Sequence, residues 1–337
     1  MVGRIIKGQG FKILTAHINN INSLTFSPQS TIIASASNDN NIIIWDLEKE
    51  QIKVLKGHSK EVNNISFSPN AQILASASLD NKIKLWNWKN MSKILINKNK
   101  FENFQNGIYD ISFHPQGKIM ASADAGFNVK LWDLDKDQEI KLPHTIKGYS
   151  TTFTPDGKTI ASTLNENIIL WSVADGSKIH TFPGIDKLSV YNIDISQDGR
   201  VLASASADKT IKLWNIQEKK LIATLEGHNG EVRDVKFHHK GKLLASASTD
   251  NTVKIWNVEK RTEITTLKRH SAPILSVGFS PDGKYLASAG EDKKIIIWDL
   301  DLLDRNKLLK FACKLAKNYL RQEKKEDMHL CDNNIDF

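Results

Sequence analysis

The chain of 337 residues is long enough for one large β domain or two smaller domains, and 40% hydrophobic with 25% charged residues is ordinary for a soluble globular protein. A formal net charge of +8 would suit a nucleic-acid or membrane-surface protein, but the lysines and arginines are scattered and form no long basic block. We therefore expect a mildly basic surface and no specific nucleic-acid binding.

The amino terminus, MVGRIIKGQGFKIL, has no apolar run long enough for a signal peptide, and no window of the sequence approaches eighteen apolar residues. The two cysteines, Cys313 and Cys331, both lie near the carboxyl end, so the rest of the chain has no thiol for a disulfide framework or a zinc knuckle. These features predict no membrane insertion and a cytoplasmic protein.

One stretch, LASASLDNKIKLW from Leu74 to Trp86, returns in close copies along the chain, such as LASASADKTIKLW and LASASTDNTVKIW. Alignment on its last residue gives seven units at intervals of 39 to 46 residues, ending at Trp45, Trp86, Trp132, Trp171, Trp214, Trp256 and Trp298. Ile83 and Leu85 alternate with lysines, and PDGK turns begin at Pro155 and Pro281. Each unit therefore predicts short antiparallel strands.

Three polar residue types recur in register with these tryptophans. A histidine precedes the tryptophan by 27 or 28 residues at His17, His58, His144, His228 and His270. A serine precedes it by ten residues at Ser35, Ser76, Ser204, Ser246 and Ser288, and an aspartate by six at Asp39, Asp80, Asp208, Asp250 and Asp292. Polar residues in constant register suggest a hydrogen-bonded set.

This pattern resembles the WD-repeat β-propeller family over about Phe11 to Leu300, and the end of the chain looks similar to bacterial WD-repeat proteins. The resemblance implies an all-β fold: a seven-bladed β-propeller of four-stranded antiparallel blades over residues 1–300. FKILTAH at Phe11 resembles IKVLKGH at Ile52, and nothing of that type follows Trp298. We therefore expect the N-terminal strand, residues 11–14, to complete the last blade and close the ring.

In this family the tryptophan, serine, histidine and aspartate form a hydrogen-bonded tetrad inside each blade. An indole N–H only donates a hydrogen bond, a hydroxyl both donates and accepts, and a neutral imidazole has one donor and one acceptor. A series of hydrogen bonds that ends on a carboxylate therefore satisfies every member. The resemblance assigns such sets to His17, Ser35, Asp39 and Trp45; His58, Ser76, Asp80 and Trp86; Ser204, Asp208 and Trp214; His228, Ser246, Asp250 and Trp256; and His270, Ser288, Asp292 and Trp298.

Units three to five depart from the pattern. Unit three has Phe104 at the histidine position and Gly126 at the aspartate position, and unit five has Asp186 at the histidine position. Unit four is one residue short, with Asn165 or Glu166 near the aspartate position. We expect incomplete tetrads in these three blades.

In the family, the fifth position after the histidine faces the upper mouth of the channel, where partners usually bind. In this sequence it holds Asn22, Asn63, Tyr109, Tyr149, Tyr191, Arg233 and Leu275. Tyrosine occupies this position in three consecutive blades and arginine in the next, which stands out because Tyr and Arg dominate binding hot spots. The alternative is that the tyrosines only fill the inner ends of blades with weak tetrads.

We therefore expect a non-catalytic, monomeric scaffold that binds a protein or peptide through Tyr109, Tyr149, Tyr191 and Arg233, flanked by Asn63 and Leu275. No cofactor, metal or catalytic residue is predicted: the histidines fall in separate blades, and no phosphate loop, metalloprotease motif or nucleophile elbow occurs. Two alternatives stay open: a sensor or regulatory propeller of a larger signalling or nucleotide-hydrolysing protein, and an enzyme with an unrecognised channel site.

After Leu300 the period changes to that of an amphipathic helix, with Leu308, Ala312, Leu315 and Tyr319 on one face. The pattern predicts a C-terminal helix over residues 301–323 and a flexible tail over 324–337. The helix either packs on the propeller or binds a partner or a membrane surface.

Overall fold

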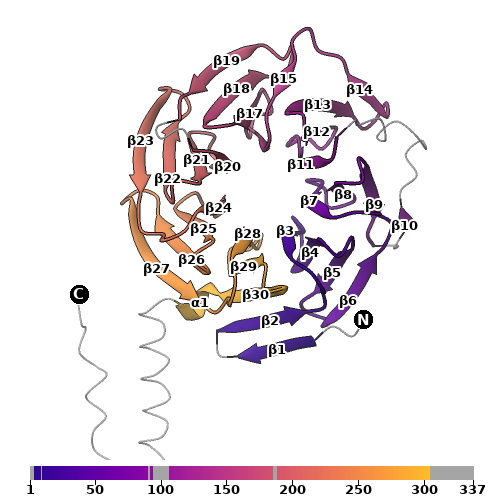
Figure 1. The fold of residues 1–337 in the computed structure, drawn as a ribbon, viewed down its shortest axis with the longest axis vertical. Helices are drawn as coiled ribbons and strands as arrows, with labels where there is room; N and C mark the ends of the chain where they lie inside the picture. Colours follow the sequence, from indigo (N-terminus) through magenta and orange to yellow (C-terminus); the bar gives the residue numbers. More distant parts are fainter. Residues whose placement is uncertain (1–3, 9, 90–91, 94–105, 185–187, 304–337) are drawn as a thin grey trace, which may run out of the picture.

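Seven antiparallel sheets stand around an open central channel in the computed structural model of the protein (Figure 1). The structure describes residues 4–8, 10–89, 92–93, 106–184 and 188–303. Each sheet is one blade, whose innermost strand lines the channel. The predicted seven-bladed, all-β propeller is therefore confirmed.

The first three blades follow the N-terminal hairpin in chain order. Blade one contains β3 (Ile21–Phe26), β4 (Ile32–Ser37), β5 (Ile42–Asp46) and β6 (Gln51–Leu55). Blade two contains β7 (Val62–Phe67), β8 (Leu74–Ser78), β9 (Ile83–Asn87) and β10 (Ser92–Lys93). Blade three contains β11 (Ile108–Phe113), β12 (Ile119–Asp124), β13 (Asn128–Asp133) and β14 (Gln138–Ile140), with β15 (Ile146–Lys147) also paired to β13.

The remaining blades repeat the arrangement. Blade four contains β16 (Thr151–Phe153), β17 (Thr159–Leu164), β18 (Asn167–Ser172) and β19 (Lys178–Phe182). Blade five contains β20 (Val190–Ile195), β21 (Val201–Ser206), β22 (Ile211–Asn215) and β23 (Lys220–Leu225). Blade six contains β24 (Val232–Phe237), β25 (Leu243–Ser248), β26 (Thr252–Asn257) and β27 (Thr262–Lys268). Blade seven contains β28 (Ile274–Phe279), β29 (Tyr285–Gly290) and β30 (Lys294–Asp299), completed from the amino terminus.

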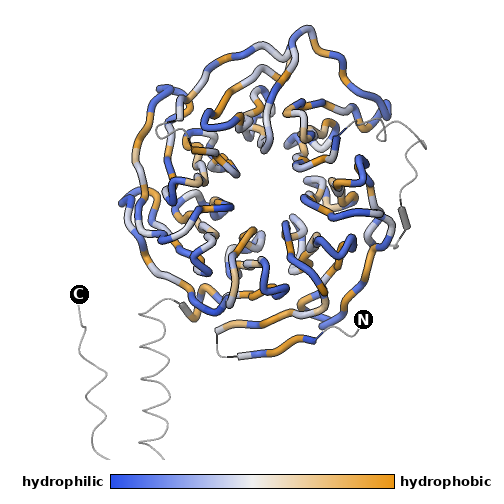
Figure 2. Tube along the Cα trace, viewed as in Figure 1, coloured by the Kyte–Doolittle hydropathy of each residue, from blue (hydrophilic) through white to orange (hydrophobic). Residues whose placement is uncertain are grey.

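The core lies between blades rather than within them. The second strand of a blade, such as β8, is buried along its whole length because a neighbouring blade covers each face. Its small residues allow close approach, and Ala75 and Ala77 pack against Ile108 and Met120 of blade three. Outer strands such as β6 alternate exposed and partly buried residues. Figure 2 shows hydrophilic and hydrophobic residues mixed along the circumference. A blade therefore depends on its neighbours to bury its faces.

The ring is closed by the N-terminal strand β2 (Phe11–Thr15), which pairs with β30 from Phe11 opposite Trp298 to Thr15 opposite Lys294. This confirms the predicted closure. The guanidinium of Arg269, which follows β27 of blade six, stacks 3.7 Å from the centre of the Phe11 ring. Leu14 is fully buried in the cluster between blades seven and one. The closing strand is thus held by both of its neighbours.

A further strand, β1 (Arg4–Gly8), was not predicted. It pairs with β2 and makes blade seven a five-stranded sheet. Gly10, at the turn of this hairpin, has a φ of 76°, a conformation that glycine adopts without strain. Most of β1 is exposed, and Lys7 pairs with Glu50 of blade one. Because β1 buries little surface and lacks the repeat pattern, no feature of the sequence predicted this strand.

At the carboxyl end, the structure describes only the first turn, α1 (Leu300–Leu303). The rest of the predicted helix over 301–323, the tail over 324–337 and both cysteines lie outside the described residues. Those predictions stay predictions.

Removal of residues 1–15 should open the ring, because it exposes the β30 edge and the apolar surface that Leu14 covers. The loss of several kcal/mol of burial should lower the melting temperature by roughly 10 °C or more and cause aggregation. Removal of residues 1–8 deletes β1 alone and should change the melting temperature by less than about 3 °C. Differential scanning calorimetry with light scattering measures both, and equal melting of the two deletions would contradict the closing role of β2.

Candidate functional site

Four blades contain a complete tetrad. In blade one, His17 Nδ1 lies 2.8 Å from Asp39 Oδ2 and Nε2 lies 2.8 Å from Ser35 Oγ, while the Trp45 indole donates to the same hydroxyl at 2.8 Å. Blades two, six and seven repeat this geometry with distances of 2.7 to 2.9 Å. These histidines and serines are buried. The structure therefore brings together the sets that the resemblance assigned to these four blades.

The aspartate of each complete tetrad also holds the upper loops of its blade. Asp250 Oδ2 accepts the backbone N–H of Asn229 at 2.9 Å, and its Oδ1 accepts from the N–H of Thr252 at 2.9 Å and from the hydroxyl of Thr252 at 2.6 Å. Burial alone would raise the pKa of Asp250, but the bonds from Thr252, His228 and Asn229 outweigh it and lower the pKa to about 2. The ionised carboxylate thus joins two loops at the upper face.

Blade five replaces the missing imidazole with an ion pair. Trp214 donates to Ser204 at 3.0 Å as in the other blades, but Asp208 pairs with the ammonium of Lys212. Both side chains are less than a tenth exposed. Burial raises the pKa of Asp208, and bonds from Lys212 and Thr210 outweigh this and lower it. The position of Asp186, where the sequence lacks histidine, lies outside the described residues.

Blades three and four keep only the tryptophan–serine bond, from Trp132 to Ser122 and from Trp171 to Ser162. In blade three, Asp124 accepts from the N–H of Gly126 at 2.8 Å and so supports the loop that lacks the usual aspartate. The incomplete tetrads expected there are observed, although Phe104 itself lies outside the described residues.

His144 does not act as the tetrad histidine of blade four, although its spacing suggested the position. It is exposed, and the hydroxyl of Ser162 instead donates to the carbonyl of Lys147 at 2.6 Å. A Cβ atom on Gly148 would lie 2.4 Å from the Ser162 side chain, so the backbone occupies the space of an imidazole. The tetrad aspartate of blade four has no counterpart either: Asn165 adopts a φ of 54° in the turn and Glu166 follows it.

The three tyrosines and the arginine form one cluster at the upper mouth, here called the mouth cluster together with Glu231. The rings of Tyr109 and Tyr149 stack with centres 4.7 Å apart at 36°. The Arg233 guanidinium lies 3.9 Å from the centre of the Tyr191 ring, and the Tyr191 hydroxyl donates to Glu231 at 2.9 Å. All five side chains are half-buried.

Electrostatics link the two halves of the mouth cluster. Burial raises the pKa of Tyr149 to about 12, the nearby Tyr109, Asp110 and Tyr191 add to the increase, and Arg233 opposes it. The phenol therefore stays protonated at physiological pH and keeps its donor. Glu231 also pairs with Arg233 at 3.4 Å, which fixes the guanidinium over the Tyr191 ring. The sequence did not reveal the role of Glu231 because its two partners come from different blades.

The two flanking residues have different environments. The amide of Asn63 donates to the carbonyl of Ile108 in blade three at 2.9 Å, and Asn22 donates in the same way to Val62 of blade two at 3.0 Å. Asn63 therefore joins two blades at the mouth. Leu275 is half-buried and lines the channel.

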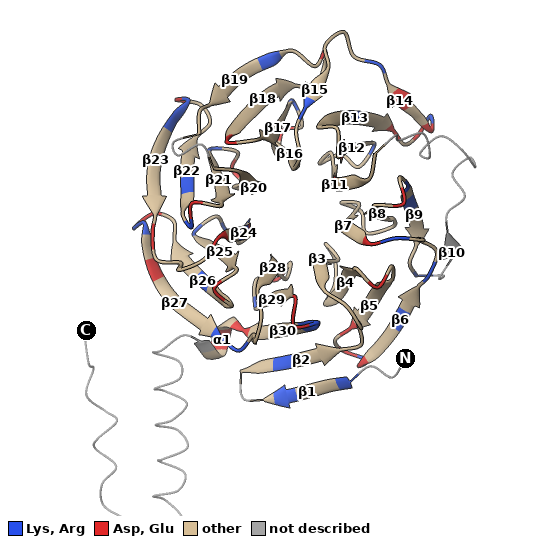
Figure 3. Cartoon of the chain, in the orientation of Figure 1, with Lys and Arg blue, Asp and Glu red and all other residues tan. Residues whose placement is uncertain are grey.

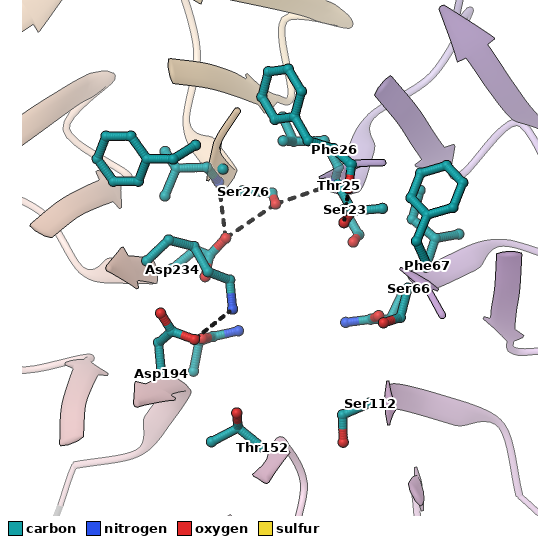
Figure 4. Close-up of a pocket in the computed structure, with 18 of the residues that line it drawn as sticks. Ser23, Thr25, Phe26, Ser66, Phe67, Ser112, Thr152, Asp194, Asp234 and Ser276 are labelled. Carbon is teal, nitrogen blue, oxygen red and sulfur yellow. Dashed lines mark hydrogen bonds and ion pairs between the residues drawn. The ribbon is translucent and has the colours of Figure 1, made fainter. Parts of the chain in front are cut away.

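Below the mouth cluster, the channel encloses a cavity of about 950 Å³ lined by all seven innermost strands (Figure 4). Its charged groups join blades. Asp110 accepts from the N–H of Thr151 at 2.5 Å, and Asp234 from the N–H of Val277 at 2.9 Å, each in the next blade. Lys236 lies 3.7 Å from Asp194. Sequence reasoning missed these groups because their partners lie one repeat away.

No group of three or more His, Cys, Asp or Glu side chains in the described part of the chain is arranged to hold a metal ion. Within the same residues, no helix has the length and apolar character needed to cross a bilayer.

Six segments of the chain match the family described as WD domain, G-beta repeat, at residues 8–46, 49–87, 97–133, 176–215, 219–257 and 261–299. Together they cover well over half of the sequence. The protein belongs to the WD-repeat family. The stretch without a match, between residues 133 and 176, contains the three inner strands of blade four, whose WD-repeat tetrad is reduced to Trp171 and Ser162.

Curated relatives share short segments of this WD-repeat chain. The guanine nucleotide-binding protein subunit beta of Oryza sativa subsp. japonica is 31% identical over 31% of the chain and 30% of its own length. The U3 small nucleolar RNA-interacting protein 2 of Homo sapiens is 34% identical over 25% and 20%, and the eukaryotic translation initiation factor 3 subunit I of Aspergillus niger is 32% identical over 21% of each.

The matched segments thus span less than a third of each of these relatives. All three relatives are eukaryotic, so they give no support to the expected likeness to bacterial WD-repeat proteins.

The ionised tetrad carboxylates should make the free energy of unfolding fall at low pH. The folded pKa of Asp250 is about 2 against an ordinary 3.8, so its contribution is present above pH 3.8 and is lost as pH falls toward 2. Asp250→Asn should lack this contribution to the loss of free energy of unfolding at low pH. After solvent screening the contribution is on the order of 1 kcal/mol. Urea unfolding between pH 2 and 6 measures it, with the exposed Asp135→Asn as a control that should follow the parent; an unchanged decline in Asp250→Asn would refute the assignment.

Blade five should be sensitive to loss of its ion pair. Lys212→Met leaves the Asp208 carboxylate buried without its cation and should lower the free energy of unfolding by about 3 kcal/mol. Lys220→Met, at an exposed position of β23, should cost below about 1 kcal/mol. Urea unfolding at pH 7 compares them, and a similar small effect of both would show that Lys212 does not substitute for the histidine.

Proposed function

We propose that the protein is a non-catalytic scaffold that binds a protein or peptide segment at the upper mouth of its channel, with Tyr109, Tyr149, Tyr191 and Arg233 as anchors. The observation that carries the proposal is the mouth cluster, in which four consecutive blades contribute two contacting pairs: Tyr109 with Tyr149, and Tyr191 with Arg233. Glu231 is bonded to the second pair. Members of the WD-repeat family generally act as platforms for protein–protein interactions, and the names of two of the relatives describe a subunit.

Exposed apolar residues near the mouth cluster support this choice of surface. Phe127 is 40% exposed and its carbonyl accepts the N–H of Gly148, the residue before Tyr149. Leu188, which is 48% exposed, precedes Tyr191 by three residues. Phe127 also has a φ of 60°, where other blades place asparagine or lysine. A bulky residue in this conformation is uncommon and tends to mark functional loops.

Preorganisation gives the proposed mechanism. The stacked rings and the Arg233–Glu231 pair are already ordered, so a partner does not spend binding free energy on immobilising them. Tyrosine contributes a large apolar face and a hydroxyl, which suits a surface that is half-exposed before binding. The partner would therefore cover the rings of blades three to five and reach Arg233 at one end.

The test is a crosslinking pull-down from source lysate, followed by affinity measurement with the recovered partner. Tyr149→Ala should weaken binding by about 2 kcal/mol, roughly thirtyfold, because a central anchor is removed. Lys178→Ala, at an exposed position on β19, should leave the affinity within about threefold. Both variants must first melt within a few degrees of the parent. Equal recovery of all partners by the parent and by a variant with alanine at Tyr109, Tyr149 and Tyr191 would refute the proposal.

A further inference from the structure

A second groove lies between blades one and two, on the lower face, which is the face opposite the tetrad loops. It has a volume of about 270 Å³ and apolar walls formed by Ile32, Ile44 and Trp88. Its edge carries the lysines of the β5–β6 hairpin and of the turn after β9, and the remaining lining residues are Asp46, Lys49, Gln51, Lys53 and Lys89. The groove is independent of the mouth cluster.

Trp88 is the one tryptophan of the eight that stands outside the repeat pattern. The equivalent position, two residues after the repeat tryptophan, holds a smaller aliphatic residue in every other blade: Leu47, Leu134, Val173, Ile216, Val258 and Leu300. Its ring packs edge-on against Phe67, with centres 5.6 Å apart at 76°. A larger, flat side chain therefore replaces an ordinary core residue at this interface.

The indole is held in place by a change on the facing turn. Trp88 Nε1 donates to the carbonyl of Ala71 at 3.1 Å. Ala71 has a φ of 54°, a left-handed conformation for which five other blades use glycine, namely Gly117, Gly157, Gly199, Gly241 and Gly283. An alanine costs more than glycine in this conformation. Blade two thus combines two unusual residues that meet, and the bond fixes the indole as one wall of the groove.

The edge of the groove carries an excess of positive charge. Lys53 and Lys89 are exposed and neither forms an ion pair in the described part of the chain, while the Lys89 ammonium lies 5.5 Å from the centre of the Trp88 ring. Asp46 accepts the N–H groups of Glu48 and Lys49 and lies 3.8 Å from the Lys49 ammonium. An incoming carboxylate would therefore meet Lys53 and Lys89, which have no competing carboxylate among the described residues.

The nearby acidic side chains are engaged elsewhere. Glu48 accepts from the hydroxyl of Thr31 at 3.0 Å, and Glu50 pairs with Lys7 of β1. Figure 3 shows both signs of charge dispersed around the circumference, so charge alone does not distinguish the groove. The groove differs from its surroundings because it combines apolar walls with Lys53 and Lys89, which form no ion pair within the described residues. That combination fits an anionic group attached to an apolar one.

We propose that this groove binds an acidic peptide segment by taking one large apolar side chain against Trp88, with flanking carboxylates at Lys53 and Lys89. The volume lies below the range of about 300–1,000 Å³ typical of small-molecule pockets, which favours a single side chain as the occupant. Burial of one such side chain with two exposed ion pairs gives modest affinity that falls as salt is added. This site does not depend on the proposed function of the mouth.

The experiment uses the full chain labelled with 5-fluorotryptophan and observed by ¹⁹F NMR, with Trp88→Leu to assign the Trp88 signal. Leucine occupies this position in three other blades, so the variant should fold. The probe is the blocked peptide acetyl-Asp-Glu-Phe-Glu-Asp-amide. Two comparison peptides isolate its features: one with alanine in place of phenylalanine, and one with lysine in place of every acidic residue.

The acidic phenylalanine peptide should shift the Trp88 signal saturably, and the two comparison peptides should not. A variant with Lys53→Gln and Lys89→Gln should bind at least about threefold more weakly, while Lys178→Gln with Lys220→Gln, at exposed positions of two other blades, should bind like the parent. If Trp88→Leu does not fold, the two lysine variants still test the proposal, because their affinities can be compared on any tryptophan signal that the acidic peptide shifts in the parent.

Two results would overturn the proposal. One is an unmoved Trp88 signal at about 2 mM acidic peptide, which would place any affinity beyond the range of a specific site. The other is an equal response to all three peptides, or equal affinity of the two lysine variants, which would show that neither the apolar side chain nor the charge is recognised.

Discussion

The burial of each blade against its neighbours is the constraint on which the whole molecule depends. The second strand of each blade has small residues and a neighbouring blade on each side. Ala75 and Ala77 of blade two, for example, are buried against Ile108 and Met120 of blade three. Burial in such an arrangement is complete only if the last blade meets the first. The pairing of β2 with β30 therefore supports every interface, and the stacking of Arg269 on Phe11 joins this seam to blade six.

Within this ring, the tetrads and the mouth cluster serve the same purpose by different means. In blades one, two, six and seven, an ionised aspartate joins the upper loops. Blades three and four lack that carboxylate, and there Tyr109 and Tyr149 stack across the interface instead. An aromatic contact between blades leaves part of each ring exposed, whereas a buried tetrad does not. The two blades that keep only the tryptophan–serine bond are thus the ones whose stacked tyrosines form part of the proposed binding surface.

How far the sequence predicts this molecule depends on whether an interaction lies within one repeat or between two. Trp86, Ser76, His58 and Asp80 belong to one unit at fixed spacing, so their register follows from periodicity once the family pattern is recognised. His144 had nearly the right spacing, but the close approach of Gly148 to Ser162 leaves no room for an imidazole, and spacing cannot report that.

The bonds between repeats were not predictable in the same way. The Lys212–Asp208 pair was also missed, although it lies within one repeat, because Lys84 and Lys254 at the equivalent position contact Gly57 and Glu263 instead. Asp110 and Asp234 follow residues of the mouth cluster directly in sequence, yet each binds a backbone group some forty residues further on. Such partners emerge only when the blades are placed side by side.

The charged groups of the channel bear on whether the molecule is a scaffold or an enzyme. Burial raises the pKa of both Asp110 and Asp234, and a perturbed carboxylate in a cleft is often a catalytic group. Here the same oxygens accept backbone N–H groups of the next blade, so a carboxylate that took up a proton would weaken an interface of the ring. Lys236, whose ammonium lies 3.7 Å from Asp194, supplies the compensating charge. Burial lowers the pKa of Lys236, but the attraction of Asp194 and Asp234 outweighs this effect and raises it. The raised pKa values of Asp110 and Asp234 are therefore explained by burial in the channel, where these carboxylates join neighbouring blades. The mouth cluster and the groove beside Trp88 are the two surfaces that we propose for partners.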